Sequence, residues 1–405
     1  MADRTSQAGI KSNTTFTIGG IGRPSANPLA EPAGGKMQNR LEKLPATLVR
    51  GPSLLPIRVG SWPGPNYHHN YFIQMFCKSL VDSGISVVHV ADPRRVSASE
   101  IDILHIHWPE KVFWDKGSFP RLLVRWATTL VSIHKLKRAG VRIVWTVHNL
   151  RPHDLERKYS LLWTVYAAQL SRLTDGFVTL CPSTVKVVRQ EISGLSQKPA
   201  IYAWHPVYPH VVPEPCRERG RQQLGIDADV RVFAFLGLLR PYKGVEELIA
   251  AFRTTESKQY ALLIAGAPAS ESYSARIKEL SAGDSRIHLR LRRLSDEEYA
   301  ALSAVADVIV LPFRDSLHSG SLVHAVSQRT AALTPAAPFA SSLQQEAGEP
   351  WIQTYTPPLT GDMLQSTTPA HGVPELSALA TNISGPKLAA FYRRLIERNG
   401  SALEP

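Results

Sequence analysis

The sequence predicts an α/β protein with two Rossmann-like parallel-sheet domains that face a central cleft. Its 405 residues exceed the size at which one hydrophobic core usually keeps growing, so two domains are expected. In both halves, short Val- and Ile-rich runs alternate with longer amphipathic stretches, which is typical of buried parallel strands and crossover helices. A proline-rich break separates the halves, so the cleft is expected between them.

The first domain is expected over residues 51–205. Residues 1–50 are rich in Ser, Thr, Asn, Gly and Pro, which indicates a flexible tail outside the fold. The expected strands lie in the apolar runs LLPIRVG, ISVVHV, ILHIHW, VRIVWTVHNL, GFVTL and AIYAW. Runs this short, separated by amphipathic stretches, predict a parallel sheet with helices between its strands.

The second domain is expected over residues 223–385, after a hinge at 206–222. The segment HPVYPHVVPEPCRERG carries four prolines among charged residues, which disfavour both helix and buried strand. Beyond it the strand pattern resumes in VRVFAFLGL, YALLIAGA, RIHLRL and ADVIVLP. The chain ends, over 386–405, with the amphipathic helix LAAFYRRLIER, which could pack on either domain.

Composition and charge narrow the function classes. The 43% apolar and 20% charged residues fit a globular protein, and a net charge of +12 indicates an anionic partner: a membrane surface, a phosphorylated substrate or nucleic acid. Cys77, Cys181 and Cys216 are far apart, which argues against a disulfide framework or a structural zinc site. There is no apolar run of roughly 20 residues and no signal peptide, so a cytoplasmic protein is expected.

The strongest candidate site is the segment FLGLLRPYKG. An apolar strand meets Gly237, a loop carries Arg240, Lys243 and Gly244, and an amphipathic helix follows. Ligands of open α/β sheets bind at the carboxyl ends of strands, where the start of the next helix presents free N–H groups to an anion. Two cations beside such a helix start predict a diphosphate site. The alternative is a solvated turn with ordinary surface cations.

A second loop repeats this pattern in ADVIVLPFRDSLHSGSLVHAV. Ser319, Gly320 and Ser321 lie where the next helix is expected to begin. Hydroxyl groups and free amides there predict a second phosphate-binding point. The alternative is a plain helix N-cap by one of the two serines.

Both segments resemble the C-terminal domain of GT-B fold glycosyltransferases, especially the family-4-like group of the kind used in bacterial exopolysaccharide (succinoglycan-type) biosynthesis. The resemblance implies a site for a nucleotide-sugar donor. The residues it assigns to donor binding are Gly237, Arg240, Lys243, Gly244, Ser316 and His324, and Ser319, Gly320 and Ser321 join them from the second loop. In the family, two glutamates follow the proline matched by Pro312, and here Ser316 and His324 take their places. Their loss implies an inverting enzyme or a divergent donor pocket.

The N-terminal half is expected to bind the acceptor and to supply a catalytic base. His148 follows a buried strand, and similar GT-B enzymes often carry a histidine there that faces the donor sugar. The alternative is a histidine satisfied within the core. Asp154, in the next loop, is a second base candidate, with a helix N-cap as its alternative.

Acceptor-binding residues are expected after the first and third strands. They are Asn66, His68, His69 and His107. For the first three, a turn with a helix cap is the alternative. His105 and His107 share one face of a strand at a spacing that could bind a metal ion, but no third ligand is evident nearby. No metal and no cofactor are therefore expected, and the nucleotide-sugar is a substrate.

The segment FPRLLVRWATTLVSIHKLKR predicts a basic helix with an aromatic residue among its apolar ones. Such a helix can lie on an anionic membrane surface. It can equally be a crossover helix whose apolar side lies in the core, and the two functions are compatible if the basic side faces outward.

The favoured hypothesis is an inverting, metal-independent hexosyltransferase. It would transfer glucose from UDP-glucose to a polyprenyl-diphosphate-linked oligosaccharide on the inner face of the plasma membrane. The alternatives are the same fold with GDP-mannose or UDP-glucuronate, and a non-catalytic protein that binds glycan or nucleotide in a polysaccharide assembly complex. Nucleic acid is not expected as a partner, because the aromatic residues are not interleaved with a basic patch.

Overall fold

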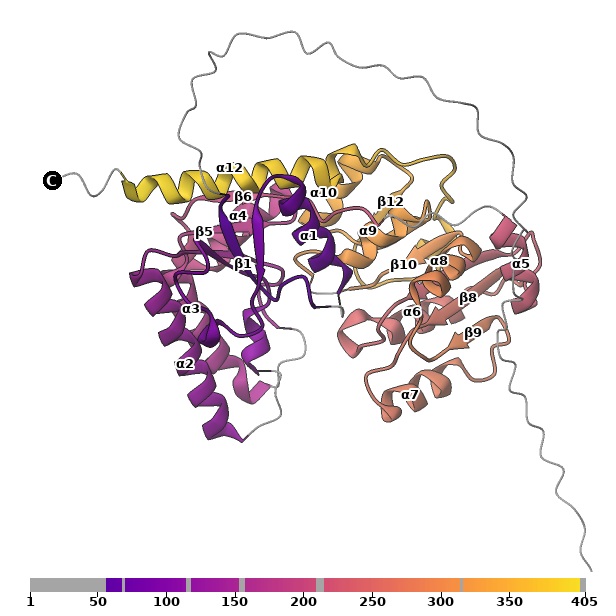
Figure 1. The fold of residues 1–405 in the computed structure, drawn as a ribbon. Helices are drawn as coiled ribbons and strands as arrows, with labels where there is room; N and C mark the ends of the chain where they lie inside the picture. Colours follow the sequence, from indigo (N-terminus) through magenta and orange to yellow (C-terminus); the bar gives the residue numbers. More distant parts are fainter. Residues whose placement is uncertain are drawn as a thin grey trace, which may run out of the picture. The chain divides into compact units, whose positions relative to one another are not determined.

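The computed structural model describes residues 56–67, 70–113, 118–152, 157–208, 215–313 and 316–400. These residues form two six-stranded sheets, each with its neighbouring strands parallel (Figure 1). The predicted α/β class with two parallel sheets is confirmed. The tail expected over residues 1–50 lies outside the described residues.

The first sheet has the strand order β2-β1-β3-β4-β5-β6. Its strands are β1 (Arg58–Trp62), β2 (Ser86–His89), β3 (Ile103–Ile106), β4 (Arg142–Thr146), β5 (Gly176–Thr179) and β6 (Ala200–Tyr202). The helices between them are α1 (Tyr71–Asp82), α2 (Phe119–Arg138), α3 (Ser160–Leu173) and α4 (Pro182–Glu191), with the 3-10 turns η1 (Pro93–Arg95), η2 (Pro109–Phe113), η3 (Arg157–Tyr159) and η4 (Ser193–Leu195). The central strands β3, β4 and β5 are almost completely buried, as expected of strands with helices on both faces.

The second sheet has the strand order β12-β11-β10-β7-β8-β9. Its strands are β7 (Arg231–Leu236), β8 (Tyr260–Ala265), β9 (Ile287–Arg290), β10 (Val308–Val310), β11 (Ala331–Pro335) and β12 (Ile352–Tyr355). Its helices are α5 (Pro215–Leu224), α6 (Val245–Arg253), α7 (Glu271–Ser281), α8 (Asp296–Val305), α9 (Gly320–Ser327), α10 (Pro338–Ala347) and α11 (Gly361–Gln365), with η5 (Pro241–Lys243) and η6 (Ser377–Leu379).

Helix α5 begins inside the segment where the prolines predicted neither helix nor strand. That expectation was wrong for its last part. Pro215 is the first residue of the helix, a position where proline loses no hydrogen bond and its fixed φ is already helical. The segment between β6 and α5 has no regular structure in its described part, residues 203–208.

Aspartates fasten the amino ends of strands in both sheets. Asp102, Asp175 and Asp307 each stand just before a strand, and each carboxylate accepts a backbone N–H from the neighbouring strand. The donors are Arg58 (2.8 Å), Ile143 (2.9 Å) and Val232 (2.7 Å). Each carboxylate also forms an ion pair with at least one basic side chain. The charges of these aspartates are therefore paired within the protein.

The Asp307 cluster is the most buried of these. Its carboxylate binds Arg217 and lies 2.7 Å from the guanidinium of Arg221, which is 4% exposed. Arg221 also donates to the carbonyl groups of Ala228 and Val230 at 2.9 Å. These bonds fasten α5 to the second sheet.

Helix α12 (Thr381–Gly400) belongs to the core of the first sheet. Its apolar side packs against a face of that sheet (Figure 1). The helix residues in this core are Leu388, Ala389, Phe391, Tyr392 and Leu395. A Cβ on Gly385 would come within 2.2 Å of the carbonyl oxygen of Ser79 in α1, so the two helices approach closely.

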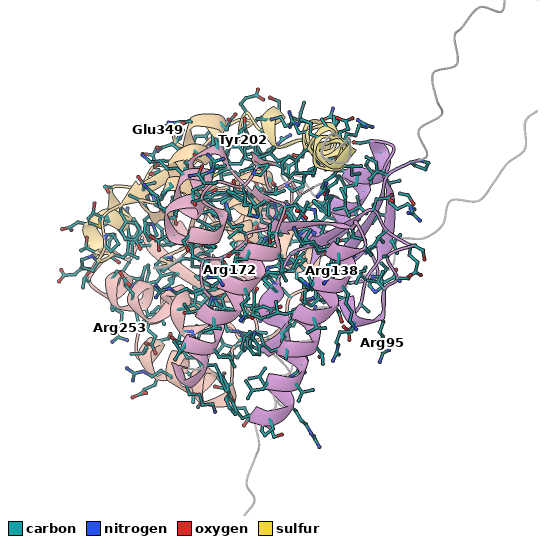
Figure 2. The ribbon with its side chains drawn as sticks, turned by 90° about the vertical axis from the view of Figure 1, so that its left-hand side faces the viewer. Arg95, Arg138, Arg172, Tyr202, Arg253 and Glu349 are labelled. Carbon is teal, nitrogen blue, oxygen red and sulfur yellow. The ribbon has the colours of Figure 1, made fainter. Side chains whose placement is uncertain are left out.

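Helix α2 combines a core side with an outward side. Leu122, Leu130 and Ile133 are buried, which confirms the crossover-helix interpretation of its apolar residues. Val124 and Val131 are more than half exposed, and the basic residues Lys135 and Arg138 of the same helix are also exposed (Figure 2, where Arg138 is labelled). Among the described residues, no helix is long and apolar enough to cross a membrane.

Candidate active site

A cavity of about 330 Å³ lies at the carboxyl ends of strands from both sheets. Its wall includes polar side chains from loops that are far apart in the sequence. The lining residues are Asn70, Phe72, Trp108, His148, Asn149, Leu180, His205, Tyr208, Tyr242, Lys243, Phe313, Ser316, His318, Ser319, Gly320 and Ser321. Six of the predicted site residues are in this set: His148, Lys243, Ser316, Ser319, Gly320 and Ser321.

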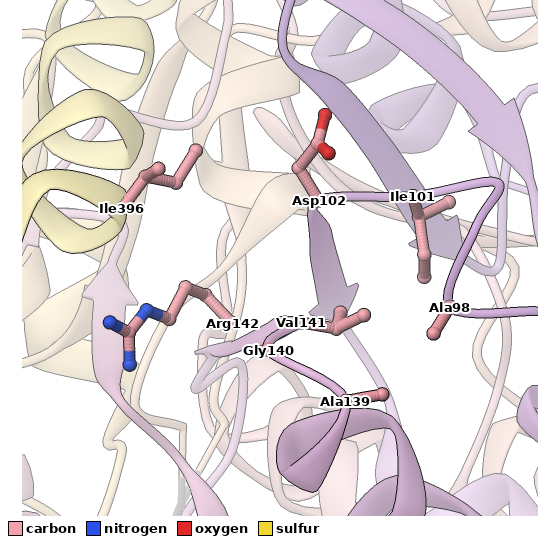
Figure 3. A pocket seen from close by; sticks show the side chains of 8 residues that line it. All are labelled: Ala98, Ile101, Asp102, Ala139, Gly140, Val141, Arg142 and Ile396. Carbon is pink, nitrogen blue, oxygen red and sulfur yellow. The ribbon is translucent and has the colours of Figure 1, made fainter. Parts of the chain in front are cut away.

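A smaller hollow of about 260 Å³ lies at the opposite, amino ends of β3 and β4 (Figure 3). Asp102 and Arg142 are on its wall. Asp102 is already paired with Arg58, and Arg142 lies 3.7 Å from Asp175. The charged groups of this hollow are therefore paired within the protein, whereas ligands of open α/β sheets bind at the carboxyl ends of the strands.

The loop after β7 has the predicted strand, glycine and helix start, and its two glycines are required by geometry. Gly244 has φ 72°, and a Cβ there would lie 2.4 Å from the carbonyl oxygen of Pro312. Gly237 has φ 121°, also favourable only for glycine. These residues shape the loop and do not line the cavity.

The two basic side chains of this loop have different surroundings. Lys243 lines the cavity, and its ammonium group lies 5.2 Å from the centre of the Phe313 ring. Arg240 does not line it, because its guanidinium donates to the carbonyl groups of Leu239 (3.1 Å) and Ala267 (3.4 Å). The structure thus separates the two, and Arg240 braces the loop.

The loop before α9 supplies hydroxyl groups and a helix N-terminus to the cavity. Ser319 is the N-cap of α9, and its hydroxyl accepts the N–H of Leu322 at 3.1 Å, so the capping alternative holds for this residue. Gly320 and Ser321 form the first turn, whose N–H groups have no partners within the helix. The Ser316 hydroxyl donates to the carbonyl of His318 at 2.6 Å.

His324 lies away from the cavity wall. Its ring is stacked between Tyr299 (3.9 Å between ring centres) and Tyr208 (4.1 Å). The predicted contact of His324 with the donor stays a prediction, because its half-buried ring does not line this cavity. Tyr208, in contrast, reaches the cavity.

His148, on the cavity wall, forms a hydrogen bond with the buried His107. Nε2 of His148 lies 3.2 Å from Nδ1 of His107, so one ring donates to the other. His107 is 1% exposed, and its Nε2 has no hydrogen-bond partner among the described residues. A buried N–H without a partner is rarer than a buried lone pair, so the favoured tautomer has His107 donating from Nδ1. His148 then carries its proton on Nδ1.

His318 connects the two sheets' loops. The N–H of Leu180 donates to its Nε2 at 3.1 Å, so the ring proton is on Nδ1, which donates to the carbonyl of His148 at 3.3 Å. Thr184 also lies 2.8 Å from Nε2. Both ring nitrogens are used within the protein.

His205 has one free nitrogen. Its Nδ1 donates to the carbonyl of Pro206 at 2.9 Å, which leaves the lone pair on Nε2. Burial keeps the pKa of His205 low, at about 4, and that of His318 at about 3. Sequence reasoning missed both residues: His205 belongs to no recognisable motif, and in the segment that contains His318 the predicted ligands were its neighbours from Ser319 to Ser321.

Glu110 is a further residue that the sequence reasoning missed. It is 6% exposed, and burial raises the pKa of its carboxyl group to about 7, while a hydrogen bond from Asn149 acts in the opposite direction. Asn149 lines the cavity, and Glu110 lies behind it. The signal in the sequence was a glutamate just after the third strand. Among the described residues on the cavity wall, none is Asp or Glu.

Two other predicted residues in the described part of the chain are not on the cavity wall. Asn66 is exposed, and His107 is buried behind His148, so neither lines the wall. His68, His69 and Asp154 lie outside the described residues. No group of three or more His, Cys, Asp or Glu side chains in the described part could hold a metal ion.

Sequence comparisons connect this site to known enzymes. Residues 217–341 match the family model described as Glycosyl transferases group 1. A GDP-mannose:glycolipid 4-beta-D-mannosyltransferase of Xanthomonas campestris pv. campestris is 26% identical over 294 residues, which cover 72% of this chain and 77% of the relative. A D-inositol 3-phosphate glycosyltransferase of Corynebacterium efficiens is 31% identical over 102 residues, 24% of each chain.

Solved structures share the fold. Alr3699/HepE of Anabaena in complex with UDP has a TM-score of 0.53 at 12% identity, over 86% of this chain and 99% of that one. A glycosyltransferase of Rickettsia africae has a TM-score of 0.53 at 11% identity, over 86% and 97% of the two chains. Identities this low show the fold alone. The fold is that of GT-B enzymes, and the sequence matches show that the chain is a glycosyltransferase.

Proposed function

We propose that the chain transfers mannose from GDP-mannose to a lipid-linked glycan, and that the cavity at the carboxyl ends of both sheets is its active site. The observation that carries the proposal is the meeting of Lys243 with the start of α9 in this cavity. A cation and a helix N-terminus together suit the diphosphate of a nucleotide-sugar.

The donor is a correction of the first expectation. UDP-glucose was favoured from the sequence, but the curated relatives that match along most of their length are named for GDP-mannose. GDP-mannose was the alternative and is now preferred. The acceptor class comes from the same relatives, whose name specifies a glycolipid. A role in exopolysaccharide assembly and a polyprenyl-diphosphate carrier are finer proposals of the same kind.

Inversion of the sugar is proposed from two observations. Ser316 and His324 replace the glutamates that accompany retention in the resembling family, and the ring of His324 is stacked between two tyrosines. The relatives' name specifies a β-linked product. Starting from the α-linked mannose of GDP-mannose, such a product requires inversion.

The roles of individual residues follow from their hydrogen bonds. Lys243 and the first turn of α9 stabilise the departing diphosphate without a metal ion. His148 was expected to be a base, but its favoured tautomer presents an N–H to the cavity, so we assign it to hydrogen bonding with the donor sugar. Asp154 stays the candidate base, and Asn149, held by Glu110, positions substrate.

Contact with an anionic membrane surface is proposed for the outward side of α2 and the start of α3. The exposed apolar residues there are Phe119 (51%), Val124 (63%), Val131 (51%) and Leu161 (76%). Lys135 and Arg138 are exposed in the last turn of α2, and Arg172 is exposed in the last turn of α3 (Figure 2 labels both arginines). Apolar residues among basic ones suit the inner face of a plasma membrane.

A transfer assay tests the proposal. The purified protein is incubated with glycolipid-bearing membranes and labelled GDP-mannose, UDP-glucose or UDP-glucuronate, each with and without EDTA. Transfer from GDP-mannose alone, unchanged by EDTA, is expected. Transfer from UDP-glucose alone would correct the donor, loss of activity with EDTA would refute metal independence, and no transfer from any donor would refute the activity.

A further inference from the structure

In its described part, the wall of the donor site proposed above has less positive charge than a diphosphate has negative charge. Among the described residues on the cavity wall, Lys243 alone carries a permanent positive charge, because Arg240 is turned to backbone carbonyl groups. The diphosphate of a nucleotide-sugar carries two negative charges. A second cation, formed when the ligand binds, would balance it.

His205 has the geometry to become that cation. Its side chain is 5% exposed, and its ring is fixed by the bond from Nδ1 to Pro206 and by Phe72, whose ring centre lies 5.0 Å away. A Cβ on Gly320 would lie only 3.0 Å from Nε2. The free lone pair of His205 therefore faces the first residue of α9, where the helix dipole attracts anions.

The other cavity histidines are less suited to take up a proton. Protonation of His318 at Nε2 would break its bond from the N–H of Leu180. Protonation of His148 at Nε2 would force the proton of His107 onto its own Nε2, which is buried and has no partner among the described residues. Nε2 of His205 makes no hydrogen bond within the described part of the chain. Protonation of this atom therefore breaks no hydrogen bond there. Besides these histidines, the titratable groups on the described cavity wall are Tyr208, whose ring centre lies 5.5 Å from that of His205, Tyr242 and Lys243.

We propose, on the basis of the donor site assigned above, that His205 is a proton-dependent ligand of the donor's diphosphate. As the donor binds, Nε2 takes a proton from solvent and donates it in a hydrogen bond to a phosphate oxygen beside Gly320. The free enzyme holds the ring neutral, because burial disfavours its charged form. The negative charge of the diphosphate reverses that preference.

The coupling of proton uptake to donor binding determines how donor affinity changes with pH. The complex binds more protons than the free enzyme at every pH between the free pKa of His205, about 4, and its higher value in the complex. Donor affinity in this range falls as pH rises, by at most about tenfold per pH unit for one proton. Below the free pKa the ring is already protonated, and the effect ends.

Titration calorimetry in buffers of different ionisation enthalpy tests the proposal. GDP-mannose and UDP-glucose are used as probes, since their diphosphates do not titrate near neutral pH. The wild-type enzyme is expected to take up a proton on binding at pH 6, whereas His205→Gln, whose amide can donate from the same place without titrating, takes up none and binds with little pH dependence. His205→Asn retains only the donor to Pro206 and should bind weakly at all pH values.

His148→Gln is the matched control and should retain proton uptake. Thermal unfolding confirms that each variant is folded. Binding without proton uptake in the wild type, or uptake that persists in His205→Gln, would overturn the role of His205 while leaving the donor site intact. Absence of binding of both donors to the wild type would instead refute the donor site, and this inference with it.

Discussion

The two edges of the sheets use polar residues in opposite ways. At the amino ends of the strands, Asp102, Asp175 and Asp307 are each bonded to a neighbouring strand and to basic side chains. At the carboxyl ends, the cavity has no Asp or Glu on its described wall, and His205 keeps a free nitrogen. Polar groups that are satisfied within the protein stabilise the fold, and groups left open are available to a ligand.

The largest effect is expected at the amino edge. Asp307→Asn leaves Arg221 buried without its counter-charge, which should lower the free energy of unfolding by about 3 to 5 kcal/mol, measured by urea denaturation. Asp229→Asn, at an exposed position, is the control and should change it little. Equal losses in the two variants would contradict the structural role of the amino edge.

A pH-dependent effect is expected for Glu110, beside the carboxyl edge. Its raised pKa means that the native state binds more protons than the unfolded state between about pH 4.5 and 7, so the stability it contributes falls as pH rises through that range. Glu110→Gln cannot ionise at this position, so its stability does not fall in the same way. The difference in the free energy of unfolding, Glu110→Gln minus wild type, should become larger by about 2 to 3 kcal/mol between pH 5 and pH 8. A gain independent of pH would show that Glu110 is ionised in the native state.

At the cavity itself, Lys243→Ala should weaken GDP binding at least tenfold, about 1.4 kcal/mol, without a comparable change in stability. Calorimetric titration measures the affinity. Lys278→Ala, on the outward side of α7, is the matched control. Unchanged affinity in Lys243→Ala would mean that the diphosphate binds elsewhere.

The smallest effect is expected on the outward side of α2. Arg138→Ala should weaken binding to vesicles containing anionic lipid by up to about 1 kcal/mol, measured by cosedimentation at low salt. Neutral vesicles should show no such difference. If Lys278→Ala weakens vesicle binding as much, the contact is a general effect of net charge and not a property of this helix.

The fold was predictable because it depends on local patterns. Ten of the strands coincide with Val-, Ile- or Leu-rich runs, and the loop from Gly237 to Gly244 has the predicted strand and helix on either side. The strands β11 and β12 were missed. In AALTP only the threonine is β-branched, and IQTY, although rich in strand-favouring residues, is only four residues long and lacks a run of Val, Ile or Leu.

The site was only partly predictable, because it depends on contacts between distant segments. Lys243 and Arg240 have the same charge and lie in the same loop, and only the nearby carbonyl groups decide which of them faces the cavity. His205 lies in a proline-rich segment, and its free nitrogen is important only because α9, more than a hundred residues later, begins beside it. No sequence pattern carries that information.

Hydrogen–deuterium exchange with and without GDP-mannose tests the central claim most directly. The donor is expected to slow exchange in residues 240–248 and 316–327, which form the loops at the carboxyl edge. Exchange at the amino ends of β3, β5 and β10 should be unchanged, because their N–H groups and aspartates are already satisfied. Protection confined to the amino edge, or no protection at saturating donor, would contradict the assignment of the active site.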